Sequence, residues 1–179
     1  DIESFWEYGD PAASEARFRA ALGQASGDDR LELLTQIART HSLRRQFDAA
    51  HAVLDEVEPR LGTAGPAPRA RYFLERGRTF NSAGDRKRAA ELFLEAWNTA
   101  TAARLAGLAV DAAHMLAIVE PPASAAQWTK RGVDRARASS DAQARGFLPA
   151  LLNNHAWNLF DERRYEDALA AFREAETAW

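Results

Sequence analysis

Residues 152–176, LNNHAWNLFDERRYEDALAAFREAE, contain the pattern that decides the fold. Side chains of similar size recur there at three- and four-residue steps in two segments, which is the spacing of one face of an α-helix. The first segment repeats at Leu152, His155, Ala156 and Leu159, and the second at Tyr165, Ala168, Phe172 and Ala175. The polar residues 161–164 predict a tight turn between the segments. Because Ala156 and Ala168 stand where two antiparallel helices approach closely, this stretch predicts a helix hairpin.

The hairpin pattern occurs along the whole chain. In each copy an entry residue is followed by small, large and small residues three, seven and ten positions later, and the copies begin at Pro11, Phe47, Arg86, Pro122 and Tyr165. The entry residues lie 36, 39, 36 and 43 positions apart. The helices before the last four entries also repeat, with small residues at Ala38, Gly77, Ala113 and Ala156. Abundant alanine and scarce β-branched residues favour helix throughout, so the sequence predicts an all-α chain of repeated hairpins.

These copies resemble the tetratricopeptide-repeat family. The unit at residues 165–175 carries the most specific match, and the unit with Gly77, Gly84-Asp85, Ala89, Phe93 and Ala96 is nearly as good. The resemblance covers almost the whole chain and departs from the family pattern at residues 121–128. It implies a right-handed superhelical solenoid of antiparallel helix hairpins, stacked because one hairpin cannot bury its faces alone. We expect one domain, residues 1–179, with units at about 1–25, 28–60, 67–103, 105–140 and 142–179.

The amino-acid composition indicates which kinds of partner and which cellular compartment to expect. The net charge of −3 gives no overall attraction to nucleic acid or to a membrane, and we expect neither as a partner. The chain has no cysteine, which excludes disulfides and thiolate metal sites and fits a reducing compartment. No apolar run approaches the roughly 20 residues of a membrane span, and the N-terminus does not look like a signal peptide. We therefore expect a cytoplasmic protein.

The family resemblance implies that the first helices of the hairpins line a concave groove that binds a peptide or helix of a partner protein. Reading the inward positions from the repeat gives Arg39, Arg78, His114, Asn153, Asn154 and Trp157 as the partner-binding residues. Four of them, Arg39, Arg78, His114 and Trp157, hold equivalent places and should form a stripe. Arginine and asparagine suit carboxylates and peptide backbone, and tryptophan gives a flat apolar anchor. As surface residues, Arg78→Ala with Asn154→Ala should abolish partner capture and change the unfolding free energy by about 1 kcal/mol or less.

The histidines of the sequence suggest functions other than that of a binding scaffold. His114 with Asp111 has the spacing of an acid–base pair on one helix, but no nucleophile accompanies it, so we predict no enzymatic activity, no cofactor and no metal. Three alternatives stay open: metal ligation by His114 and His155, a peptide- or ligand-responsive regulatory sensor of the same repeat type, and a homo-oligomer through the open solenoid ends. Trp179, with Leu169 and Phe172, would lie at one such end. His155 is expected to be a core histidine, and His51 a solvated one.

Overall fold

The computed structural model describes residues 2–178, and these residues contain ten α-helices, two short 3-10 helices and no strand. The predicted all-α class is confirmed. The contacts divide the chain into two compact units, one ending at Thr99 and the other beginning at Ala100. The expectation of one domain with five repeats stays a prediction, and Trp179 lies outside the described residues. None of the described helices has the length and apolar character needed to cross a bilayer.

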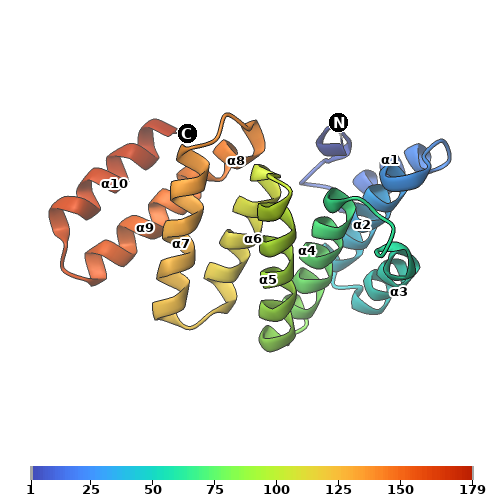
Figure 1. The fold of residues 1–179 in the computed structure, drawn as a ribbon, viewed down its shortest axis with the longest axis horizontal. Coiled ribbons are helices and arrows are strands. Elements are labelled where there is room, and N and C mark those ends of the chain that lie inside the picture. Colours follow the sequence, from blue (N-terminus) through green and yellow to red (C-terminus); the bar gives the residue numbers. More distant parts are fainter. Residues whose placement is uncertain (1, 179) are drawn as a thin grey trace. The chain divides into compact units, whose positions relative to one another are not determined.

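The first unit consists of three successive helix pairs (Figure 1). They are η1 (Ile2–Phe5) with α1 (Pro11–Leu22), α2 (Gly27–Leu43) with α3 (Phe47–Val57), and α4 (Pro66–Ser82) with α5 (Arg86–Ala102), and η2 (Glu58–Arg60) follows α3. Helix α2 packs against α1, α3 and α4. The largest side chains that the pattern assigned to the interior are fully buried, among them Phe18, Ile37, Leu54 and Phe93.

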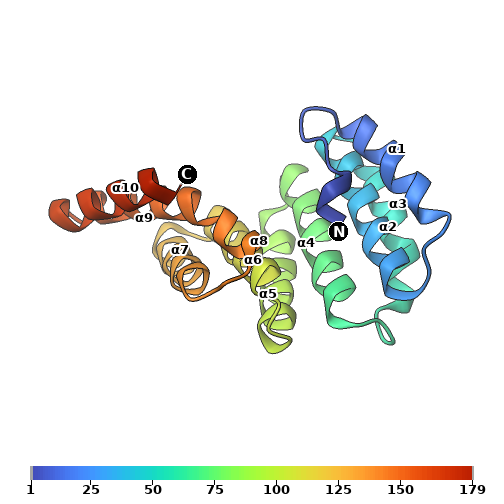
Figure 2. The same cartoon turned by 90° about the horizontal axis from the view of Figure 1, so that it is seen from above.

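The second unit contains α6 (Ala106–Val119), α7 (Pro122–Arg137), α8 (Ala142–Gly146), α9 (Leu148–Asp161) and α10 (Tyr165–Ala178). Helices α6 and α7 form one antiparallel pair, and α9 and α10 form another, as Figure 2 also shows. The short α8 was not predicted. It is separate from α9 because Pro149 lies in the first turn of α9, where a missing N–H is tolerated, whereas the same proline inside a longer helix would break it.

Four helix connections share one cap. The second residue after the helix has a left-handed backbone, with φ of 60° at Arg45, 96° at Gly84, 59° at Arg104 and 62° at Arg163. The next backbone N–H then donates to the carbonyl five residues earlier, at 2.9 Å in each case: Gln46 to His41, Asp85 to Phe80, Leu105 to Ala100 and Arg164 to Leu159. This hydrogen bond satisfies a carbonyl that the end of the helix leaves open. The chain therefore reverses in the same way at each of these connections.

Small residues allow close contact inside the helix pairs. Ala38, Gly77, Ala113 and Ala156 are all buried. At Gly77 a Cβ atom would lie 2.6 Å from Cε1 of Phe93, which is closer than real contacts allow. The glycine therefore lets α4 approach the ring on α5, as the repeat pattern predicted.

Candidate functional site

In the first unit, two of the predicted partner-binding residues meet at one buried carboxylate. Glu75 on α4 is 2% exposed, and its Oε1 accepts a hydrogen bond from Nη1 of Arg78 at 2.6 Å. The same oxygen lies 3.9 Å from Nη1 of Arg39 on α2. The Arg39 and Arg78 side chains keep 24% and 14% of their surface exposed, so both remain partly accessible to solvent. We call Arg39, Glu75 and Arg78 the arginine–glutamate site.

The N-terminal segment covers one side of this site. The guanidinium carbon of Arg39 lies 5.1 Å from the ring centroid of Trp6, which is the geometry of a cation–π contact. Nε1 of Trp6 donates to Oε1 of Gln36 at 3.0 Å, and both side chains are buried. Trp6 thus covers part of the inner surface of α2, which the sequence analysis assigned to a partner. Arg39 lies at the edge of the covered area.

A second row of ion pairs connects the N-terminal segment, α2 and α4. Arg71 on α4 contacts Oε2 of Glu32 on α2 through its Nε at 2.8 Å, and its Nη1 lies 3.5 Å from Oε1 of Glu3 on η1. The repeat pattern gave no indication of these ion pairs. Together the two rows hold the side chains of Arg39, Arg71 and Arg78 through contacts within the first unit.

The burial of Glu75 changes one expectation from the sequence. Removing Arg78 takes away the closest counter-charge of a carboxylate that has almost no contact with water. Arg78→Ala should therefore cost more than the 1 kcal/mol or less that applies to surface residues. In this fold Arg78 compensates a buried charge as well as being a candidate contact residue.

The second unit holds the other predicted residues. His114 on α6 packs against Phe147, with 5.7 Å between the ring centroids, and Asp111 on the same helix is buried. Asn153, Asn154 and Trp157 are exposed on α9. A continuous stripe would require these residues to lie in line with Arg39 and Arg78 of the first unit. The stripe therefore stays a prediction.

Sequence reasoning missed an aromatic cluster on the last hairpin. The ring of Trp157 meets Phe160 at 5.7 Å and Phe172 at 5.3 Å, and Phe160 meets Tyr165 at 5.2 Å, all edge-on. Leu169 is exposed on the same side of α10. Trp157, Phe160, Tyr165, Leu169 and Phe172 are called the aromatic patch below. The sequence analysis grouped Tyr165 and Phe172 with Ala168 and Ala175 on one helix face, but only the two alanines are buried. Together with Leu169, Tyr165 and Phe172 form a separate apolar stripe at three- and four-residue spacing.

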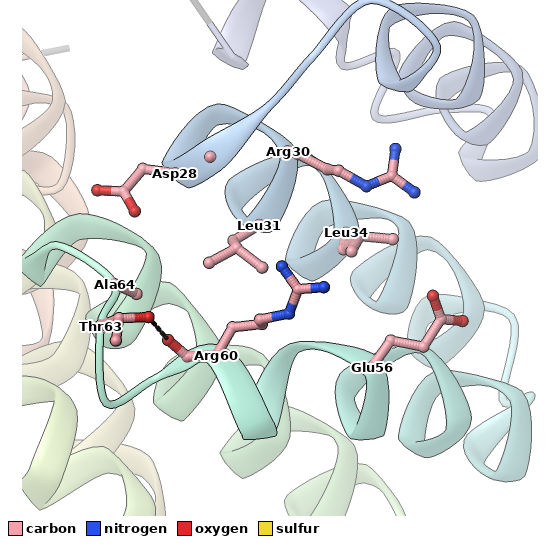
Figure 3. A pocket seen from close by; sticks show the side chains of 9 residues that line it. Asp28, Arg30, Leu31, Leu34, Glu56, Arg60, Thr63 and Ala64 are labelled. Atoms are coloured by element: carbon pink, nitrogen blue, oxygen red, sulfur yellow. Dashed lines mark hydrogen bonds between the residues drawn. The ribbon is translucent and has the colours of Figure 1, made fainter.

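A pocket of about 380 Å³ opens in the first unit beside the N-terminus of α2 (Figure 3). Leu31 and Leu34 form its apolar wall, and Arg30, Arg60 and Glu56 stand at its sides. Asp28 also lines this pocket, and its carboxylate accepts the backbone N–H of Gly65 at 3.0 Å. None of these residues was predicted as a site.

A larger pocket, of about 580 Å³, lies in the second unit between α7 and the α9–α10 hairpin. His155 lines it together with Lys130, Arg137 and Arg164, so the expectation of a core histidine is wrong. Burial lowers the pKa of His155, and the positive charges of Arg137 and Lys130 lower it further. Arg137 is itself paired with Glu174, whose carboxylate accepts from Nε at 2.8 Å. The walls of this pocket therefore carry charges of both signs.

His51 is also placed differently from its prediction. Its Nδ1 lies 3.0 Å from Nη1 of Arg76 and accepts a hydrogen bond from it, and its ring lies 4.6 Å from that of Phe80. Arg76 is buried and also bonds to Asp55 at 2.5 Å. Burial lowers the pKa of His51, and the positive charge of Arg76 lowers it further, because it disfavours a second positive charge on the ring. The solvated histidine expected from the sequence is a structural acceptor.

Among residues 2–178, no group of three or more histidine, aspartate or glutamate side chains is placed to hold a metal ion.

Comparisons with known proteins identify the fold. No family model matches the sequence, and no curated protein matches it either. The structure is similar to the crystal structure of the apo form of RapI, with a TM-score of 0.71 and 13% sequence identity. The fold is a helical repeat of tetratricopeptide type. The match covers 94% of this chain and 48% of RapI, so the chain spans about half the length of RapI. At this identity the likeness shows the fold alone, which agrees with the predicted solenoid of hairpins.

Proposed function

We propose that this protein is a non-enzymatic protein–protein interaction module. The first helix of each hairpin would contribute to a surface that binds a peptide or helix of a partner protein. The observation that carries the proposal is the arginine–glutamate site, where two guanidinium groups share one buried carboxylate. The residues proposed to contact the partner are those predicted from the sequence: Arg39, Arg78, His114, Asn153, Asn154 and Trp157.

The two guanidinium groups of the arginine–glutamate site favour an anionic group on the partner. Arg39 and Arg78 each carry a positive charge on a side chain that is partly exposed. A carboxylate of the partner would form charge-assisted hydrogen bonds with them. Because Glu75 and Trp6 already hold the guanidinium groups, binding would cost little ordering of these long side chains.

The exposed residues on α9 suit the backbone and an apolar side chain of a peptide. Each of the amides of Asn153 and Asn154 offers both a donor and an acceptor, the two groups that an extended backbone requires. Trp157 offers a half-exposed ring as an apolar anchor.

The test is a selection from a random peptide library on the immobilised protein, followed by affinity measurements on variants. Asn154→Ala should weaken the selected peptides by about tenfold, the effect of losing roughly 1.4 kcal/mol. The matched control is Asn98→Ala, the same change at an exposed position on the second helix of a hairpin. Equal affinities for the two variants, or a library that yields no binder, would contradict the proposal.

The arginine–glutamate site is tested by charge rather than by truncation. Arg39→Gln removes one cation and keeps a planar side chain that can still cover Trp6. If an acidic group of the peptide binds there, the affinity should fall and its dependence on salt should become weaker. An unchanged salt dependence would exclude this site from the interface and leave the contacts on α9 to be judged separately.

A further inference from the structure

The aromatic patch is the largest group of exposed apolar side chains on the described part of the second unit. Trp157 is 53% exposed, Phe160 47%, Tyr165 56% and Leu169 50%. The rings of Trp157, Phe160, Tyr165 and Phe172 contact one another in a chain, and Leu169 lies one helical turn from Tyr165 and from Phe172, so these residues form one surface instead of isolated apolar residues. Single exposed apolar residues are ordinary, but a contiguous patch of this kind marks a surface that another molecule covers.

The charges beside the patch indicate which molecule that is. Along α10, Tyr165, Leu169, Phe172 and Glu176 follow steps of four, three and four residues, which is the spacing of a helix–helix seam. Glu166 and Arg173 flank this seam on its outer side, and both are exposed. Neither forms an ion pair with another residue in the described part of the chain.

We propose that this surface binds a second copy of the same chain, with the two α10 helices antiparallel about a two-fold axis. In this alignment Leu169 packs against Phe172 of the second copy, and Phe172 packs against its Leu169. The flanking positions then bring Glu166 opposite Arg173 of the second copy. The two-fold axis repeats this ion pair, because in an isologous interface each contact occurs twice.

Self-complementarity is the reason for choosing a second copy over an unrelated helix. Opposite charges seven positions apart on one flank pair with each other when the helix meets its own reversed image, so this chain already carries the charges that its partner helix needs. The small apolar area of the aromatic patch indicates that the two copies would associate reversibly. A half-exposed aromatic or leucine side chain offers roughly 100 Å², so the four half-exposed side chains of the patch supply about 400 Å² per copy, below the 800 Å² or so of a standard interface.

The proposal does not rest on the peptide-binding function proposed above. It uses the outer side of α10 and the rings next to it, whereas peptide binding uses the arginine–glutamate site and the two asparagines of α9. Trp157 belongs to both sets, so variants at Trp157 are not used to test either.

The experiment is sedimentation velocity on the 179-residue chain over a range of concentrations, from low micromolar to several hundred micromolar. The wild-type protein should show a monomer–dimer equilibrium. Glu166→Arg places two arginines opposite each other, and Arg173→Glu places two glutamates opposite each other, so each variant alone should dimerise at least about tenfold more weakly. An equimolar mixture of the two variants should restore dimers, because every cross-pair is again of opposite charge.

Two further variants complete the design. Leu169→Glu should abolish dimers at all concentrations, and Glu91→Arg, a charge reversal at an exposed position of α5, should leave them unchanged. Circular dichroism confirms that each variant is folded. A wild-type protein that stays monomeric, dimers that survive Leu169→Glu, or a mixture that fails to restore association would each overturn the proposed interface.

Discussion

Arg78→Ala tests whether the arginine–glutamate site stabilises the fold. The substitution removes a 2.6 Å hydrogen bond to Glu75 and the nearest positive charge of a carboxylate that is 2% exposed. It leaves Arg39, whose Nη1 lies 3.9 Å from the same oxygen. The buried charge therefore loses most, but not all, of its compensation.

The magnitude follows from these contacts. A hydrogen bond to a charged group contributes about 1.5–3 kcal/mol, and removing one partner of a buried ion pair costs about 3–5 kcal/mol. Because Arg39 remains, we expect the unfolding free energy to fall by about 2–3 kcal/mol. For a chain of this size that loss lowers the Tm by about 4–12 °C.

Urea unfolding followed by tryptophan fluorescence measures the change. Arg88→Ala is the matched control, since its ion pair with Asp85 is exposed at both ends, and it should change the unfolding free energy by about 0.5 kcal/mol or less. In a Glu75→Gln background, Arg78→Ala should cost at least 1 kcal/mol less than in the wild type, about the value of one hydrogen bond. An Arg78→Ala cost that equals the Arg88→Ala cost, or that is the same in both backgrounds, would refute the reasoning.

Two further predictions concern packing and pH. Gly77→Ala should destabilise the first unit by about 1–3 kcal/mol, because its Cβ would lie 2.6 Å from Cε1 of Phe93. His51, whose folded-state pKa is lowered by burial and by Arg76, should make the protein less stable as the pH falls below about 6.5, the value in an unfolded chain. The unfolded state then binds the proton more readily than the folded state, so acid favours unfolding.

Thermal unfolding of matched variants checks both effects. Gly146→Ala is the control for packing, because nothing lies within 4 Å of the Cβ that it adds; a similar loss at both glycines would exclude the contact with Phe93. His51→Gln keeps an acceptor for Arg76 and removes the titration, so its Tm should depend less on pH between about 5 and 7 than that of the wild type. The remaining dependence includes His155, whose pKa is lowered as well.

The sequence predicted the helices well because their determinants are local. The small residues of the repeat and the entry positions depend on spacing within one hairpin, and the turn between residues 161 and 165 lies where the polar segment placed it. The separate helix α8 was missed because Pro149 fits a helix start as well as a break, and the choice depends on how α8 packs on α6.

The candidate site was harder to predict because its environment comes from distant residues. Inward positions on α2 and α4 could be read from the repeat, but the sequence does not show that Trp6 covers Arg39 or that Glu75 is buried beneath Arg78. His51 was assigned to solvent because its helix is the outer one of its pair. Its partner, Arg76, approaches from the next hairpin, 25 residues further along the chain.

The carboxylate shared by Arg39 and Arg78 has a consequence for engineering. Repeat proteins are often treated as interchangeable modules, which can be shuffled or duplicated as long as their apolar faces match. Here the third hairpin carries an anion whose compensation comes partly from the second. Moving the third hairpin elsewhere in the array would leave this anion short of one counter-charge, so the electrostatics restrict the order in which these hairpins can follow one another.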